Sequence, residues 1–211
     1  MGKKIIIPGA NFADNGMAAT FDVLDYIVAN SDTQLIYSGV NIALKTKVVW
    51  DFAVADNTAA VGNVFAGSNF QTADCALGLF LRDTGYLYAY IARNNAVNSI
   101  AIGTSRHIAE VSLAGFVVDG TNYADSLTIP SSISRTENIP ILGRTASGQT
   151  TKTFPGVRVY GVKIYSDYDD ASTLVIDAIP VKKLDGTVCF YNKVNGEYLV
   201  TADGTNPSYG V

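Results

Sequence analysis

The chain has 211 residues, 48% of them hydrophobic, and a formal net charge of −4. The hydrophobic content is enough to bury a full core, which excludes global disorder. The negative charge argues against a nucleic-acid partner, because binding phosphates requires clustered Lys and Arg. No stretch approaches the roughly 18 consecutive apolar residues of a membrane helix, so we expect no membrane association.

Residues 1–20 are predicted to form an N-terminal arm ahead of one domain at 21–211. Ile5, Ile6 and Ile7 form a short apolar run that Pro8-Gly9 ends. The run is shorter than the roughly 7–15 apolar residues of a signal-peptide core, so we expect no export signal. Three exposed isoleucines invite pairing with a strand of another chain. We therefore expect them to contact a neighbouring subunit, with a strand paired to the chain's own C-terminal end as the alternative.

Thr46–Val54 is the clearest strand pattern in the first half of the chain. Val48, Trp50 and Phe52 alternate with more polar residues and so lie on one face. Trp50 is the only tryptophan, and in this register it is expected to anchor the core rather than to serve as a sugar platform.

A row of tyrosines marks the strand expected at 85–91. Tyr86, Tyr88 and Tyr90 share one face, opposite three apolar residues. Aromatic faces stack on sugar rings, which makes these tyrosines candidate ligand-binding residues. Cross-strand packing of half-buried rings is the alternative, and the pattern favours it.

Phe154–Leu199 contains the strongest strand signals of the chain. Its expected strands are Arg158–Tyr165, Leu174–Val181, Thr187–Tyr191 and Glu197–Val200. In the first of them the period of two places Tyr160, Val162 and Ile164 on one face, which we expect to lie in the same core as Trp50. Asp185-Gly186 and Asn195-Gly196 are typical of tight hairpin turns, as is Asp119-Gly120 upstream.

Strand patterns recur every 8–12 residues, with Gly, Asn and Asp between them, and no segment has a helical period. This spacing predicts an all-β, antiparallel two-sheet sandwich in a single domain. Further strands are expected at 24–27, 33–40, 64–67, 76–81, 99–102, 107–113, 116–118 and 139–144.

The residues give little indication of catalysis. A glycoside hydrolase needs two carboxylates at a fixed spacing, and the three glutamates lie in no such pattern. His107 is the only histidine and has no partners for a metal site in the sequence, and no Gly-x-Ser-x-Gly motif is present. We expect no enzymatic activity, no transition metal and no cofactor, with a glycoside hydrolase as the disfavoured alternative.

Asp167, Asp169 and Asp170 form a candidate calcium site, because carboxylate oxygens on a loop suit that ion. They also lie in what reads as a plain hairpin turn, and turn chemistry explains them without an ion. The two cysteines, Cys75 and Cys189, are expected to be free thiols, since a core of this size needs no disulfide.

The C-terminal motifs carry a resemblance to a known family. The segments GVRVYGVKIY, LVIDAIPV and DGTVCFYNKVNGEYL resemble LamG-like (concanavalin A-like) jelly-roll domains of phage and prophage structural proteins from gut bacteria. The run at 191–196, YNKVNG, is the most specific, since the family usually has Asp at the second position. The resemblance covers roughly residues 24 to 205 and implies a jelly-roll sandwich.

The resemblance implies a non-enzymatic virion module, a phage fibre or decoration subunit that binds host cell-surface glycan or other virion proteins. It also implies a homo-oligomer, with a trimer favoured. The alternative is a carbohydrate-binding adhesion module of a bacterial surface protein. Only 16% of residues are charged, against about 25% in an average soluble domain, and this too favours a virion or extracellular location.

Overall fold

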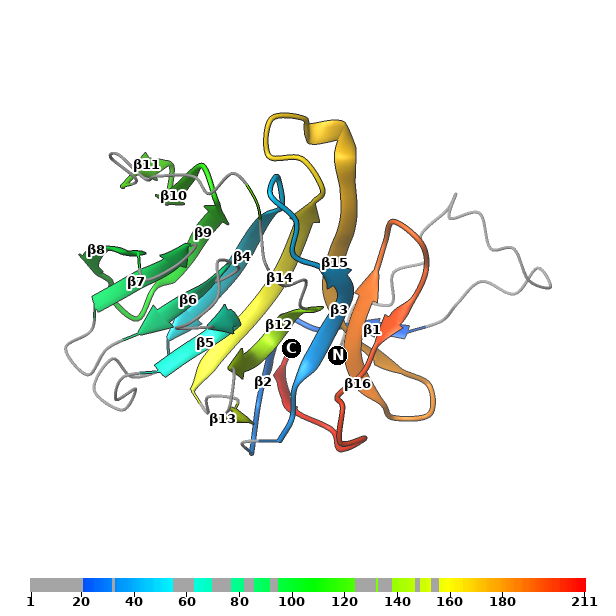
Figure 1. The fold of residues 1–211 in the computed structure, drawn as a ribbon. Helices are drawn as coiled ribbons and strands as arrows, with labels where there is room; N and C mark the ends of the chain where they lie inside the picture. Colours follow the sequence, from blue (N-terminus) through cyan, green and yellow to red (C-terminus); the bar gives the residue numbers. More distant parts are fainter. Residues whose placement is uncertain are drawn as a thin grey trace.

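The computed structural model describes residues 21–31, 33–54, 63–69, 77–81, 86–91, 95–123, 132, 138–146, 149–152 and 156–211. Within these ranges the chain is all-β, and its one helical turn is the 3-10 segment η1, Ala171–Thr173 (Figure 1). The predicted fold class is confirmed at this level. Among the described residues, no helix is long and apolar enough to cross a membrane.

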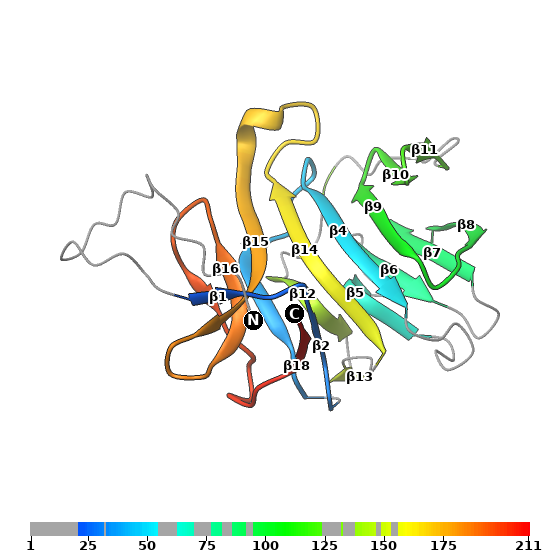
Figure 2. The ribbon, with the colours of Figure 1, turned by 180° about the vertical axis from the view of Figure 1, so that it is seen from behind.

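The larger sheet has 11 strands among the described residues, and its main path runs β11-β10-β9-β4-β14-β15-β16-β17. Strand β1 pairs with β15, β2 with β14, and β18 with β2 (Figure 2). The strands are β1 (Phe21–Val23), β2 (Tyr26–Val28), β4 (Lys47–Val54), β9 (Arg106–Ser112), β10 (Gly115–Val118), β11 (Thr121–Asn122), β14 (Val157–Tyr165), β15 (Leu174–Lys183), β16 (Val188–Asn192), β17 (Tyr198–Leu199) and β18 (Ser208–Gly210).

The smaller sheet has seven strands in the described ranges, ordered β13-β12-β5-β6-β7-β8, with β3 also on β12. They are β3 (Ile36–Asn41), β5 (Asn63–Asn69), β6 (Leu77–Leu81), β7 (Tyr86–Ile91), β8 (Asn95–Ala101), β12 (Asn138–Ala146) and β13 (Gln149–Lys152). The described pairs are antiparallel except β5 and β12, which run parallel. Alternation along a strand reports its faces and not the direction of its neighbour, so the sequence could not indicate this exception.

The two sheets pack face to face around one core. Trp50 and Phe52 of the larger sheet are fully buried, as are Leu79 and Leu87 of the smaller sheet, and all belong to one cluster. Burying each such side chain stabilises the fold by roughly 1.5–3 kcal/mol. The predicted register of β4 and the core position of Trp50 are confirmed.

Strand β14 departs from the predicted alternation at one point. The register against β4 shifts between Val159 and Gly161, so that Tyr160 is an extra residue, a β-bulge. Val159 and Val162 are both buried, whereas Tyr160 lies on the outer face of the sheet. The expectation that Tyr160 faces the core was wrong, because a bulge reverses the alternation for the residues that precede it.

A second, smaller cluster lies at the end of the larger sheet where β1 pairs with β15. Phe21, Val181, Cys189 and Tyr191 are buried there, and the rings of Phe21 and Tyr191 are 4.8 Å apart. Cys189 is a free thiol, as predicted, and burial raises its pKa to about 11. Cys75 and the arm with Ile5, Ile6 and Ile7 lie outside the described residues.

Candidate functional site

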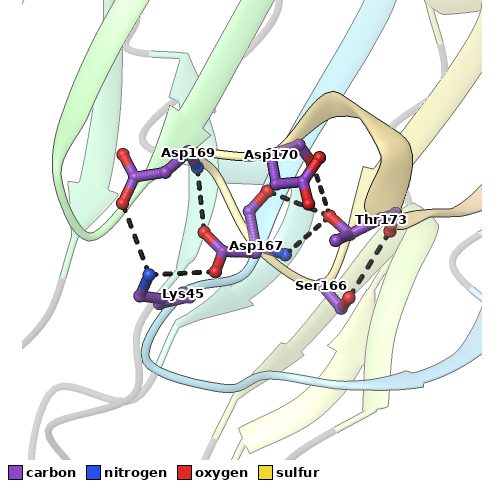
Figure 3. Close-up of polar contacts among 6 residues, drawn as sticks. All are labelled: Lys45, Ser166, Asp167, Asp169, Asp170 and Thr173. Carbon is purple, nitrogen blue, oxygen red and sulfur yellow. Dashed lines mark hydrogen bonds and ion pairs between the residues drawn. The ribbon is translucent and has the colours of Figure 1, made fainter.

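The acidic turn after β14 is held by a lysine from a distant part of the chain. Lys45 Nζ lies 2.9 Å from Asp167 Oδ2 and 3.4 Å from Asp169 Oδ2 (Figure 3). The hydrogen bond from Lys45 lowers the pKa of Asp167, and the N–H of Asp169 donates to the same carboxylate. The Tyr168 N–H also donates to the Lys45 carbonyl, so the lysine fixes this turn to the loop before β4.

Asp170 does not bond to Lys45 as the other two aspartates do, and instead caps a helical turn. Its carboxylate accepts a hydrogen bond from the Ser172 N–H at 2.8 Å and caps η1. Across the described ranges, no group of three His, Cys, Asp or Glu side chains is placed to hold a metal ion. A calcium ion at Asp167 and Asp169 would have to displace the Lys45 ammonium, and the calcium site remains a prediction.

The tyrosine row lies on the outer face of the smaller sheet. Leu87, Ala89 and Ile91 are buried in the core, whereas Tyr86 is 39% exposed and Tyr88 half-buried. The Tyr88 ring packs edge-on against Phe80 of β6, with centroids 6.2 Å apart. This contact is the cross-strand packing expected as the alternative to a sugar platform. The side chain of Tyr90 lies outside the described part of the structure.

A groove of about 320 Å³ crosses the outer face of the larger sheet, over β9, β4, β14 and β15. The bulge in β14 shapes it. The Tyr160 side chain lines the groove. Gly161 beside it has no side chain, so the backbone itself lines the groove where β14 approaches β15. A Cβ atom at Gly161 would lie 3.3 Å from the Ala178 carbonyl oxygen, so a side chain is tightly restricted there.

One end of the groove is formed by an aromatic ring and a bidentate ion pair. Arg106 donates from Nε to Asp51 Oδ1 at 2.6 Å and from Nη2 to Oδ2 at 2.5 Å. The same guanidinium lies over the Tyr160 ring, 4.3 Å from its centroid. The Tyr160 ring in turn packs edge-on against Tyr26. These contacts fix the planes of Arg106, Asp51 and Tyr160 before any ligand arrives.

The other end is formed by Asp177 of β15 and Lys193, which follows β16. Lys193 Nζ lies 2.6 Å from Asp177 Oδ2. The Oδ1 of buried Asn192 accepts from the Asp177 N–H, and the Lys193 N–H donates to the Asp177 carbonyl, so the two backbones are fixed side by side. Exposed Lys163, between the two ends, forms no ion pair with any other described residue.

The groove therefore combines fixed hydrogen-bonding groups with an aromatic ring and exposed apolar surface, including Ile108, which is 48% exposed. The sequence does not indicate this groove, since its charged residues lie in four strands and at Lys193 after β16, far apart in the chain. The one available signal was Gly161 in the middle of a strand pattern, which is typical of a bulge. Comparison with protein-family models, curated proteins and solved structures finds no match for this chain.

Proposed function

We propose that this chain is a glycan-binding module of a virion fibre or decoration subunit, and that the glycan lies in the groove over β4, β9, β14 and β15. The groove is the observation on which the proposal rests. Sugars present hydroxyl groups that both donate and accept, together with an apolar C–H face. The ion pairs at the two ends of the groove can bond to the hydroxyl groups, and the Tyr160 ring at one end can pack on the C–H face.

The charges of the groove favour an acidic sugar. Its lining holds two carboxylates, Asp51 and Asp177, against three cations, Arg106, Lys163 and Lys193. Four of these groups pair with one another, which leaves Lys163 without a carboxylate among the described residues. A sugar that carries a carboxylate would supply the missing partner. Binding should then weaken as salt concentration rises.

Glycan binding is tested by screening the protein on immobilised glycans and measuring the affinity of any bound sugar by calorimetry. We expect Tyr160→Ala and Lys163→Ala each to weaken binding at least about tenfold, the loss of one ring or ionic contact of roughly 1.4 kcal/mol. Tyr86→Ala, on the opposite sheet, is the matched comparison. Loss of binding in Tyr86→Ala but not in Tyr160→Ala would move the glycan to the tyrosine row and overturn the groove proposal.

The virion assignment is supported by the resemblance of the C-terminal motifs and by the low content of charged residues. It is tested by the mass of the purified chain in light scattering, before and after deletion of residues 1–20. We expect a homo-oligomer, with a trimer as the symmetry that the resemblance implies, and dissociation on deletion of Ile5, Ile6 and Ile7. A monomer in both cases would favour the adhesion module of a bacterial surface protein instead.

A further inference from the structure

Three consecutive polar residues, one just before β9 and two at its start, have side chains that point alternately to the two sides of the larger sheet. Arg106 points outward into the groove. His107 points the other way and packs near Phe52, with ring centroids 6.1 Å apart and only 12% of its side chain exposed. Ser105 precedes the strand, is exposed, and hydrogen-bonds to His107. The imidazole thus lies at the rim of the core, next to an accessible hydroxyl.

A chain of hydrogen bonds links a carboxylate, this imidazole and this hydroxyl. Asp119 Oδ2 lies 2.7 Å from His107 Nδ1, and Ser105 Oγ lies 3.2 Å from His107 Nε2. An ionised carboxylate only accepts hydrogen bonds, so Nδ1 must carry the proton of the neutral ring. Nε2 is then the acceptor for the Ser105 hydroxyl. This is the tautomer that a general base needs in order to take a proton from serine.

Asp119 is itself held in position. It occupies the turn between β10 and β11, with a left-handed backbone at φ 50°. Its Oδ1 accepts a second hydrogen bond, from the Ile108 N–H at 2.9 Å. Burial alone would raise the pKa of Asp119, but the hydrogen bonds from His107 and Ile108 outweigh it and lower the pKa. The carboxylate therefore stays ionised at neutral pH and orients the imidazole from one side.

The space beside Ser105 suits an incoming acyl group. Among the described residues, a Cβ atom at Gly103 would meet no atom nearer than Ser105 Oγ, at 4.0 Å, so none of them crowds this side of the hydroxyl. In the part of the chain that the structure describes, the backbone N–H groups of Thr104 and Ser105 donate to no other residue. They are available as donors to the oxyanion of a tetrahedral intermediate.

We propose that Ser105, His107 and Asp119 form a nucleophilic triad that hydrolyses esters of small acyl groups. Ser105 is exposed, which favours an acetyl-sized group on an alcohol over a larger acyl chain that would need burial. This activity goes beyond glycan binding, and it departs from the expectation from sequence that the chain is not an enzyme.

The reaction has two balanced steps. The Ser105 oxygen bonds to the ester carbonyl carbon while its proton passes to His107 Nε2. The ester C–O bond then breaks, and the alcohol leaves with that proton. A water molecule next attacks the acyl-serine, again giving its proton to Nε2. The bond between the acyl carbon and the Ser105 oxygen then breaks, and Nε2 returns the proton to that oxygen. The carboxylic acid and free Ser105 are released, so only ester and water are consumed.

The test uses the full chain with a fluorophosphonate probe, which bonds covalently to activated serines, and with p-nitrophenyl acetate. We expect the probe to add to the peptide that contains Ser105, as located by mass spectrometry. Ser105→Ala should abolish labelling at this site, and His107→Gln should lower both labelling and ester hydrolysis at least about 100-fold. Asp119 is a positioning residue, and Asp119→Asn should lower both the rate of labelling and the rate of ester hydrolysis by about tenfold or more.

Ser172→Ala, which removes an exposed serine from η1, is the matched control and should keep full labelling. If the histidine and aspartate only fasten the β10–β11 turn, their variants lower thermal stability while the wild-type chain takes up no probe at Ser105. That result overturns the proposal. Because Ser105 is exposed, its alanine variant tests the chemistry even if a His107 variant fails to fold.

Discussion

Two turns of the larger sheet share the dipeptide Asp-Gly and use it differently. Asp119-Gly120 joins β10 to β11, and both residues have positive φ angles, 50° and 80°. Asp185-Gly186 lies between β15 and β16, and there only Gly186 is left-handed, at φ 89°. The sequence predicts a hairpin turn at each place, and both turns are present.

The difference follows from loop length. Asp119-Gly120 is a two-residue loop with positive φ at both positions, as in the type I′ turn, whose twist matches that of its strands. At Asp185 the Lys183 N–H bonds to the Thr187 carbonyl, so three residues form the loop and one left-handed glycine is enough. The same dipeptide therefore adopts two backbone conformations, chosen by the pairing of the flanking strands.

The two carboxylates consequently have different partners. Asp185 bonds within its own turn, to the Thr187 N–H at 2.9 Å and to Lys183 Nζ at 2.9 Å. Asp119 reaches across to the neighbouring strand and bonds to His107 and Ile108. The turn at Asp185 is held by contacts within itself, whereas the turn at Asp119 also holds His107 in place.

The largest difference in stability between the two turns is expected when the carboxylate of each is removed. Asp119→Ala leaves the half-buried His107 Nδ1–H and the Ile108 N–H without their acceptor, which should lower the free energy of unfolding by about 1–3 kcal/mol. Asp185→Ala exposes its former donors to water and should shift the urea midpoint much less. Equilibrium urea denaturation compares the two variants, and equal shifts would show that Asp119 too serves only its own turn.

Replacing the glycine of either turn is expected to destabilise the fold by an intermediate amount, equal for the two turns. Gly120→Ala and Gly186→Ala each place a Cβ atom on a left-handed backbone, with no neighbouring atom within 4 Å of it. Backbone strain alone should then cost about 1–2 kcal/mol at either position. Thermal unfolding of the matched pair checks this. A cost at one glycine only would show that the two left-handed glycines are not equally strained.

The smallest effect on stability is expected from protonating Asp185 in acid. Hydrogen bonds from Thr187, followed by Lys183, lower the pKa of Asp185 from 3.8 to about 2. The folded state thus binds this proton less readily than the unfolded chain, so stability is present above pH 4 and is lost as pH falls toward 2. Asp185→Asn should flatten the stability profile in this window, as measured by urea denaturation at each pH. An unchanged profile would show that its ionisation is not linked to folding.

Much of the fold could be predicted from the sequence because it depends on local patterns. The alternation around Trp50 identified the buried face of β4, and the Asp-Gly and Asn-Gly dipeptides identified turns. In each case the information lies within a few neighbouring residues. Even so, the bulge at Tyr160 escaped the pattern, since one extra residue changes which side chains face outward without changing the composition of the strand.

The candidate sites depended on the tertiary structure. Asp51 lies in β4, Arg106 in β9 and Lys193 just after β16, and no spacing in the chain indicates that they share one groove. The sequence shows no metal-site partner for His107 and does not indicate Asp119, which lies 12 residues away across a turn whose length only strand pairing determines. The acidic run at 167–170 was predicted as a candidate ion site, and its ionic partner in the structure is Lys45, which is 122 residues distant from Asp167. Local sequence sets the faces and turns, whereas the contacts between strands decide which charged side chains meet.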